Sequence, residues 1–355
     1  MNTLGVDDVQ PDDEVSGPAT ASVPDGQHAV PGGEVAQEAT GAGRPGRSVP
    51  ELAALCVVLI GLVVYFSVAS EFFLATNNII NILTAIAVTG ILAAPGTMLL
   101  IAGQVDLSVG AATALCGVVL ATVAPDVGIP VAVLCALLAG IAVGVINGAL
   151  VTVIGVNSLI VTLGGLAAYR GTTFLIADGQ TVVMADFQWL GTARPFLNIP
   201  VPVILFAVVA TVILVVLRYT VYGRNVYAIG ANPVAARLVG IRRRTVVFIA
   251  FVASGLAAAL AGLVLTSQLS AAVPNAALGL ELTVVTAIVL GGASLNGGRG
   301  SVVGTVLGLM IIGVLNNGLT LMNVSSYWQQ VASGVLLITA VSFDRVREHF
   351  SRSTS

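Results

Sequence analysis

Long stretches without a charged residue alternate with short polar segments along the chain from residue 51 onward. A helix that crosses the hydrocarbon core of a bilayer needs about 20 mostly apolar residues. Four of the uncharged stretches are close to that length, and two are long enough for two helices each. The single stretches are 52–70, 107–125, 195–217 and 282–298, and the double ones are 127–169 and 300–343.

Two further uncharged stretches, 72–105 and 245–280, are too short for two comfortable crossings but leave residues over after one. Each predicts one transmembrane helix plus a re-entrant or interfacial piece. The pattern therefore predicts an all-α, polytopic membrane domain over residues 51–343, with about ten transmembrane helices, some of them broken or re-entrant.

The two ends of the chain have a different pattern. Residues 1–50 are rich in Pro, Gly, Ala and acids, and they have no periodic apolar positions. Such a segment cannot bury enough apolar surface to offset the entropy of ordering it, so we expect a disordered N-terminal tail. Residues 344–355 form a short polar C-terminal tail.

Glycines recur at four-residue spacing in two of these stretches. They are Gly140, Gly144 and Gly148 in the first, and Gly300, Gly304 and Gly308 in the second. Small residues at this spacing let helix backbones approach closely in lipid. Both runs therefore predict tight helix packing.

The composition excludes several classes of protein. Of 355 residues, 9% are charged and 57% are apolar, whereas a soluble domain carries about 25% charged residues. Residues 1–50 hold eight of the 17 acids and two of the 14 basic residues, so few charges remain to solvate the rest. This composition excludes a soluble enzyme, a disordered scaffold and a disulfide-stapled secreted domain.

The ionisable residues exclude further chemistry. All 14 basic residues are Arg, so the chain has no Lys for a phosphate-binding loop or a Schiff base. The two histidines, His28 and His349, lie in the tails, which leaves the membrane domain without an imidazole for a metal site, a catalytic triad or a proton relay. We expect no catalytic residue, no metal site and no cofactor, and we interpret the three cysteines as small apolar residues.

The arginines predict the orientation. The loop over residues 218–244 contains six Arg and no acid, which places it in the cytoplasm by the positive-inside rule. Further arginines precede the first span and follow the last. With ten spans, both termini lie on the same cytoplasmic side.

That loop also contains a short helix signal. Asn232 suits an N-cap, Pro233 suits the first helical position and Gly240 suits the C-terminal cap. These residues predict a two-turn helix over 233–239. Because so short a helix is marginal alone, either it rests on its own membrane domain or it docks into a cytoplasmic partner.

A lone carboxylate marks a second candidate site. Asp106 lies at membrane depth between Gly103 and Gly110, and intramembrane ionisable residues are expensive and usually functional. One interpretation is a broken helix that lines a path for a solute. The other is that Asp106 caps the helix that follows it, and the two roles are compatible. We interpret Glu281 as a carboxylate at a helix start.

Several segments resemble one protein family. Residues 103–110, Gly-Gln-Val-Asp-Leu-Ser-Val-Gly, resemble the GGIDLSVG segment of ribose-type permeases of ATP-binding-cassette (ABC) sugar importers, with Gln104 in place of a usual Gly. The resemblance extends in order over about residues 70–345. It includes the segments 160–164, 169–171, 223–232, 235–241, 290–294 and 297–300.

The resemblance implies the permease fold and a homodimeric permease, not an enzyme, for a monosaccharide such as ribose or another pentose. It implies two partners: an ABC ATPase subunit with tandem nucleotide-binding domains, which hydrolyses the ATP, and an extracytoplasmic sugar-binding protein. No nucleic acid is expected. The chain would lie among lipids of a bacterial cytoplasmic membrane.

The resemblance also implies roles for single residues. The short helix matches the coupling helix that contacts the ATPase, although Val234 stands where Glu is often found. The implied ATPase-coupling residues are Asn232, Pro233, Ala235, Ala236, Arg237, Leu238 and Gly240. Polarity in apolar surroundings, together with the motif match, makes Gln104, Asp106, Ser108, Asn147, Thr162, Tyr169 and Asn296 candidates for the translocation path.

Two other functions are compatible with a polytopic protein. A proton- or sodium-coupled secondary transporter needs intramembrane carboxylates with partners, and the membrane domain offers only Asp106 and Glu281. An intramembrane enzyme would depend on carboxylates, but no span contains a pair of acids at helical spacing. The sequence therefore favours the importer permease over both.

Overall fold

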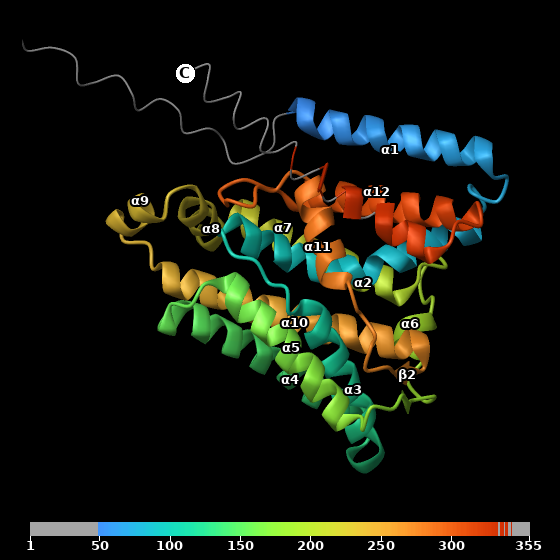
Figure 1. Cartoon of the computed structure of the whole chain (residues 1–355), viewed down its shortest axis with the longest axis horizontal. Helices are drawn as coiled ribbons and strands as arrows, with labels where there is room; N and C mark the ends of the chain where they lie inside the picture. Colours follow the sequence, from blue (N-terminus) through green and yellow to red (C-terminus); the bar gives the residue numbers. More distant parts are fainter. Residues whose placement is uncertain (1–48, 333, 337, 340–341, 343–355) are drawn as a thin grey trace, which may run out of the picture. The chain divides into compact units, whose positions relative to one another are not determined.

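The computed structural model describes residues 49–332, 334–336, 338–339 and 342. The predicted tails over 1–50 and 344–355 lie outside these residues, apart from Val49 and Pro50, which begin the first helix. The described part is almost entirely helical (Figure 1).

The helices follow one another along the chain with short connections. The longer ones are α1 (Val49–Ala69), α2 (Thr76–Ile101), α3 (Val109–Val127), α4 (Ile129–Ala149), α5 (Ser158–Ile176), α7 (Val201–Tyr219), α10 (Arg243–Leu269) and α12 (Val302–Leu321). The shorter ones are η1 (Leu150–Ile154), α6 (Trp189–Thr192), α8 (Val221–Ala231), α9 (Pro233–Leu238) and α11 (Leu280–Leu290). Strands β1 (Val182–Val183) and β2 (Ala271–Ala272) form a small antiparallel pair.

The prediction of a polytopic all-α membrane protein is confirmed. Within the described residues, eight helices are long and apolar enough to cross a membrane, and each corresponds to a predicted span. The segments 72–105 and 245–280 each correspond to one such helix followed by non-helical residues. The segment 127–169 corresponds to α4 and α5, but α5 continues past Arg170 to Ile176. Of the two helices predicted over 300–343, α12 is the first, and the second falls on a stretch that lies partly outside the described residues.

The predicted span over 282–298 is wrong as a single helix. Helix α11 has 11 residues, a length of about 16 Å, which is roughly half of the hydrocarbon core. The chain then turns, and Gly292, Gly297 and Gly298 adopt positive φ angles that end a helix. The prediction was wrong because it used only the absence of charge over 282–298. The helix ends at glycine turns, which carry no charge.

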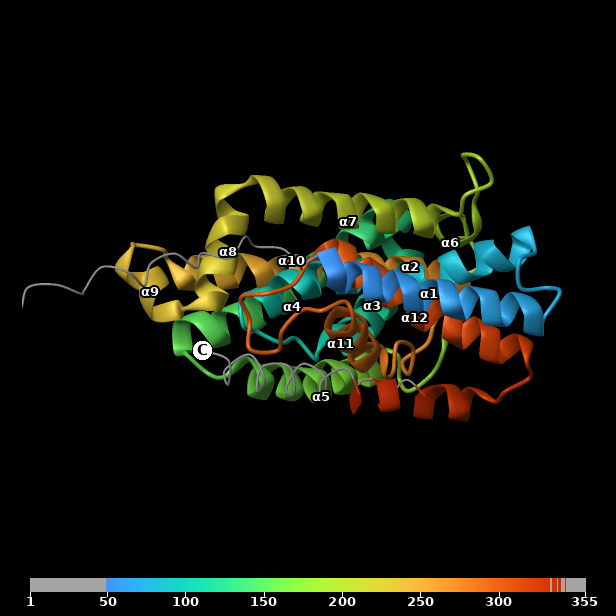
Figure 2. The ribbon, with the colours of Figure 1, turned by 90° about the horizontal axis from the view of Figure 1, so that it is seen from above.

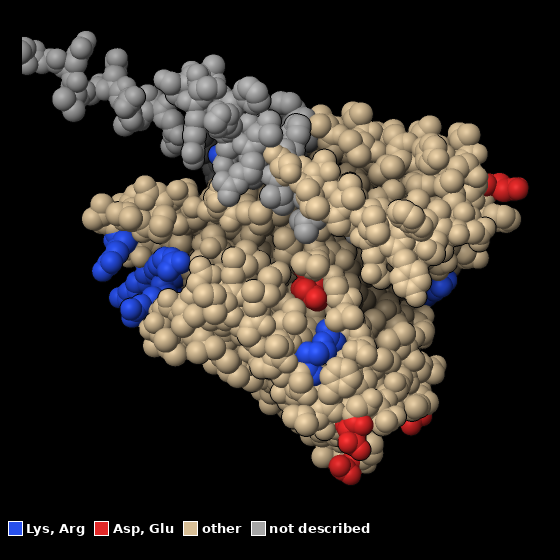
Figure 3. All heavy atoms as spheres, in the orientation of Figure 1, with Lys and Arg blue, Asp and Glu red and all other residues tan. Residues whose placement is uncertain are grey.

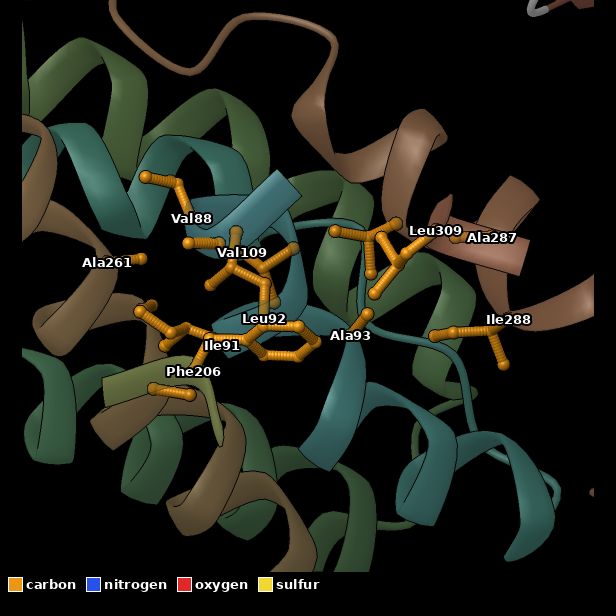
Figure 4. Close-up of a cluster of buried hydrophobic side chains, with 14 of the residues drawn as sticks. Val88, Ile91, Leu92, Ala93, Val109, Phe206, Ala261, Ala287, Ile288 and Leu309 are labelled. Carbon is orange, nitrogen blue, oxygen red and sulfur yellow. The ribbon is translucent and has the colours of Figure 1, made fainter. Parts of the chain in front are cut away.

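Helices α2 and α10 occupy the interior. Helix α2 packs against α7, α10, α11 and α12, and α10 packs against α2, α3 and α4. Figure 2 shows α7 along one edge and α5 along the opposite edge, with α10 between them. The main apolar cluster joins Leu92 of α2 to Phe206 of α7 and Leu309 of α12 (Figure 4).

The predicted glycine packing is confirmed for the glycines within α4 and α12, whereas Gly300 lies in the loop before α12. A Cβ atom on Gly140 or Gly144 of α4 would collide with α10, at the Gly255 carbonyl and the Phe251 carbonyl respectively. Gly308 of α12 has equally little room beside α11. The backbones of these helix pairs therefore touch, as expected for association that depends on van der Waals contact in lipid.

Substituting a side chain at the α4–α10 contact should destabilise the fold. We expect Gly255→Val to lower the free energy of unfolding by about 1–3 kcal/mol or more through overpacking, measured by unfolding in mixed detergent micelles. Gly61→Val on α1 is the control, because a Cβ there meets no atom within 4 Å. Equal loss of stability in the two variants would contradict the prediction.

Candidate translocation site and coupling helix

The chain is unwound between α2 and α3. Helix α2 ends at Ile101 and α3 begins at Val109, and Gly103 has a φ of +72°. Unwound backbone at membrane depth is tolerated only where it is buried in protein or lines a water-filled cavity. The residues 102–108, which we call the α2–α3 break, therefore need internal hydrogen-bond partners.

Asp106 is the centre of these partners. Its Oδ1 accepts hydrogen bonds from the Ser108 amide at 3.0 Å and from the Ser108 hydroxyl at 2.7 Å. Its Oδ2 accepts one from the hydroxyl of Ser254, on α10, at 2.8 Å. Asp106 thus stabilises the turn that leads into α3 and also ties this turn to α10, so it combines the two roles considered from the sequence.

The hydrogen bonds continue into α4 and α5. Asn147 Nδ2 donates to the Ser108 hydroxyl at 2.9 Å, and the Tyr169 hydroxyl donates to Asn147 Oδ1 at 2.8 Å. The result is a continuous chain from Tyr169 through Asn147, Ser108 and Asp106 to Ser254, which we call the polar network. It joins the break to three helices.

Burial divides the polar network into two groups. Ser108, Asn147 and Ser254 are buried, whereas Asp106 and Tyr169 are half-buried. The buried members hold the others in place, and the half-buried ones keep part of their surface accessible.

Thr162 lies beside the network. It is buried on α5, and its hydroxyl donates to the Ser158 carbonyl at 2.9 Å and lies 3.4 Å from the Val105 carbonyl. The structure thus brings together Asp106, Ser108, Asn147 and Tyr169, with Thr162 next to them. Ser254 was missed by the sequence analysis, because one Ser among the Ala and Gly residues of α10 gave no distinguishing signal.

Gln104 and Asn296 lie apart from the polar network. Gln104 is buried and its Nε2 donates to the Gly103 carbonyl at 2.7 Å. Asn296 is exposed in the loop that follows α11, and its carbonyl oxygen would lie 3.7 Å from a Cβ on Gly103. Both residues therefore belong to a second location, where the break meets the loop.

Four glycines make this second location possible. The Gly298 amide donates to the Ile101 carbonyl at 2.8 Å, and Gly230 of α8 packs so closely on both groups that a Cβ there would collide with them. A Cβ on Gly297 would lie 2.9 Å from Gly103. We call Gly103, Gly230, Gly297 and Gly298 the glycine junction, and it connects α8 with the end of α2.

Two tyrosines of α8 anchor the same region. The Tyr227 hydroxyl donates to the Gly300 carbonyl at 2.9 Å, and the Tyr222 hydroxyl donates to the Val246 carbonyl at 2.8 Å. Burial raises the pKa of both phenols. Both remain neutral hydrogen-bond donors at physiological pH, because a phenol already titrates near 10 when exposed.

The predicted short helix is confirmed as α9. Asn232 Oδ1 accepts hydrogen bonds from the amides of Val234 and Ala235, each at 3.0 Å. Pro233 occupies the first helical position and Gly240 has a φ of +80°. The cap residues therefore do what their types predicted, although α9 ends at Leu238, one residue earlier than expected.

Helix α9 presents apolar side chains to solvent. Val234 is 68% exposed and Leu238 is 83% exposed, while Ala236 is buried against the rest of the chain. Exposed arginines surround them, and Figure 3 shows basic side chains gathered at this end of the molecule, whereas the charges elsewhere on that face are scattered and of both signs. The exposed arginines of this region are Arg224, Arg237, Arg242, Arg243 and Arg244.

Comparison with known proteins identifies the family. A family model described as "Branched-chain amino acid transport system / permease component" matches residues 78–341. The ribose import permease protein RbsC of Escherichia coli K12 is 38% identical over 299 residues, which cover 82% of this chain and 93% of that protein.

Two further relatives are named for the transport of other sugars. The D-allose transport system permease protein AlsC of Escherichia coli K12 is 37% identical over 296 residues, 82% of this chain and 90% of that protein. The L-arabinose ABC transporter permease protein AraH of Azospirillum brasilense is 35% identical over 301 residues, 84% of this chain and 89% of that protein. No solved structure matches significantly.

The hydrogen bond between Asp106 and Ser254 predicts energetic coupling. Asp106→Ala and Ser254→Ala should each lower the free energy of unfolding by about 1–3 kcal/mol, because each breaks the hydrogen bond that ties the α2–α3 break to α10. The double variant should lose at least about 0.5 kcal/mol less than the sum. Unfolding in mixed micelles measures all three.

Thr113→Val supplies the control for this cycle. Thr113 is buried on α3, but within the described part of the chain its hydroxyl bonds to the Val109 carbonyl of its own helix and to no other group. We expect its effect to add to that of Asp106→Ala. Additivity between Asp106 and Ser254 as well would contradict the network.

Proposed function

The chain belongs to the permease family of ABC importers and is a monosaccharide permease subunit, and on that premise we propose that it conducts ribose or another pentose. The observation that carries this proposal is the similarity to a ribose permease over 93% of that protein's length. The allose and arabinose relatives are nearly as similar, so the sugar-binding partner would select among related sugars.

Helix α9 is the proposed docking element for the ATPase. An isolated two-turn helix is marginal alone, and exposed Val234 and Leu238 would be buried by a partner. Since Val234 replaces the usual Glu, the contact at this position is apolar rather than ionic. Arg237 is exposed on the same helix and is available to a carboxylate of the partner.

The glycine junction supplies a route from α9 to the membrane interior. Helix α8 directly precedes α9, and Gly230 of α8 touches the Ile101 carbonyl at the end of α2. A displacement of α9 by the ATPase would therefore reach the α2–α3 break through backbone contacts alone. Gln104 and Asn296 lie at this point and are proposed to form a gate of the path.

The polar network is proposed to border the path. Half-buried Asp106 and Tyr169 would face the passing sugar, and buried Ser108 and Asn147 would position them. Thr162 supports the break from α5 through its approach to the Val105 carbonyl. Hydroxyls, an amide and one carboxylate are suitable partners for sugar hydroxyls.

A second copy of the chain is proposed to complete the transporter. Helix α5 exposes Ile160 and Leu163, and a Cβ atom on its Gly164 or Gly171 would meet no atom within 4 Å outside the nearby backbone of the helix. Such a face is suited to close contact with the same helix of a partner. The complex would also include a tandem ATPase and an extracytoplasmic sugar-binding protein.

The arginine distribution supports the proposed orientation. Five exposed arginines gather in the α8–α10 region, so by the positive-inside rule we place α9 in the cytoplasm. Six of the described spanning helices precede α9 and two follow it, and these even numbers support the proposal that both termini lie on the same side. We place the protein in a bacterial cytoplasmic membrane, as a transport subunit whose ATP is hydrolysed on the partner chain.

Uptake in proteoliposomes tests the proposed function. The chain, the ATPase and the sugar-binding protein are reconstituted together, and accumulation of radiolabelled D-ribose, D-allose and L-arabinose is measured. We expect uptake of at least one sugar that requires all three proteins and ATP. Uptake that persists without the ATPase would contradict the proposal and favour an ion-coupled transporter.

Truncating the exposed tip of α9 should weaken the proposed docking. We expect Leu238→Ala to reduce affinity for the ATPase by about tenfold, since truncating a buried interface anchor costs about 1–2 kcal/mol. The change would be measured by titrating the ATPase onto the purified chain. Val221→Ala is the control, because Val221 is 63% exposed on α8 but outside α9, and an equal loss there would contradict the assignment.

A further inference from the structure

A second polar site lies apart from the α2–α3 break. A cavity of about 340 Å³ lies between α2, α11 and α12, beside Gln329. Its lining includes Asn81 from α2, Thr283 from α11, and Asn316 and Thr320 from α12. We propose that this cavity binds a monosaccharide within the permease, an inference that rests on the proposed function.

The hydrogen bonds around the cavity leave one acceptor unused. Asn316 Oδ1 is buried and has no hydrogen-bond partner among the described residues. The Thr320 hydroxyl, in contrast, donates to the backbone carbonyl of Asn316 at 2.8 Å, not to its side chain, and accepts from Gln329 Nε2 at 3.0 Å. A buried acceptor without a donor costs about 1–3 kcal/mol, which a ligand hydroxyl would recover.

A neighbouring pair of amides fixes the wall of the cavity. Asn317, which also lines it, exchanges two hydrogen bonds of 2.9 Å with Asn78 of α2. These side chains hold α2 and α12 together, so the wall does not depend on a ligand. Because the side-chain amide of Asn317 is already paired with Asn78, the amide of Asn316 is the one of the two that is available to a ligand.

The chemistry of the lining favours a neutral polyhydroxylated ligand. None of the described residues that line the cavity is charged, which disfavours an ion or a phosphate headgroup. Amides and hydroxyls alternate with aliphatic side chains such as Ile82, Ile86 and Ile312. A sugar presents both hydroxyls and apolar C–H surfaces, and the volume is within the range of small-molecule sites.

The position of the cavity indicates that it would hold the sugar at an early step of transport. It is lined by the first half of α2 and the second half of α12, which are the ends away from the glycine junction. A buried hydrogen bond of 2.7 Å between Thr97 and Thr305 joins the same helices between the cavity and the junction. In the proposed orientation, the cavity receives the sugar on the extracytoplasmic side and this pair closes its inner end.

Protection of introduced cysteines tests binding directly. Cys56, Cys116 and Cys135 are first replaced by Ala, and Thr283→Cys is then labelled with a hydrophilic maleimide in the purified chain. Saturating D-ribose, D-allose or L-arabinose should slow labelling by about tenfold for at least one sugar, since protection follows 1 + [L]/Kd. Thr84→Cys on α2, which does not line the cavity, is the control and should not be protected.

A second variant separates binding from folding. Asn316→Leu removes the unused acceptor, so it should abolish protection at Thr283→Cys and reduce uptake about tenfold, while the unfolding temperature stays equal or rises. Protection by none of the sugars, or unchanged protection in Asn316→Leu, would overturn the cavity assignment. If the wild-type assembly takes up none of the three sugars, the proposed function itself fails, so the two failures are distinguishable.

Discussion

The constraint on which the rest of the structure depends is the stretch of unwound backbone between α2 and α3, with the half-buried carboxylate of Asp106 in it. Such groups are expensive in hydrocarbon unless every hydrogen bond is made internally. Asp106 meets this requirement with three hydrogen bonds from Ser108 and Ser254. Ser108 belongs to the break itself and directly precedes α3, whereas Ser254 lies on α10, so these hydrogen bonds tie the break to α10 at the point where α3 begins.

Close backbone contacts connect the α2–α3 break and its neighbouring helices rigidly to the rest of the chain. Where α4 meets α10 and where α11 meets α12, glycines remove the side chains that would separate the helices. At the glycine junction, Gly230 in the same way places α8 against the Ile101 carbonyl at the end of α2. Rigid contacts of this kind transmit a displacement without charged relays, which agrees with a chain whose energy source is proposed to lie on a partner.

Much of the fold follows from the sequence because the relevant signals are local. Uncharged stretches predicted the eight described spanning helices, although α5 continues past Arg170. Asn232, Pro233 and Gly240 predicted α9 through their own capping geometry. The end of α11 at Leu290 was not predicted, since glycine turns rather than charges determine it. Ser254 and the glycine junction depend on which helices become neighbours, and no local pattern encodes that.

The most direct test is whether the Gly230→Ala variant changes the coupling ratio, which is the number of sugar molecules taken up per ATP hydrolysed. It tests the claim that the glycine junction links the ATPase to the translocation path. A Cβ at Gly230 has no room beside the Ile101 carbonyl, whereas Gly61→Ala, the control, meets no atom within 4 Å. Both variants are reconstituted with the ATPase and the sugar-binding protein, and sugar uptake per ATP hydrolysed is measured. The account predicts that Gly230→Ala still binds the ATPase and permits hydrolysis, while uptake per ATP falls about tenfold or more. A coupling ratio equal to that of Gly61→Ala would contradict it.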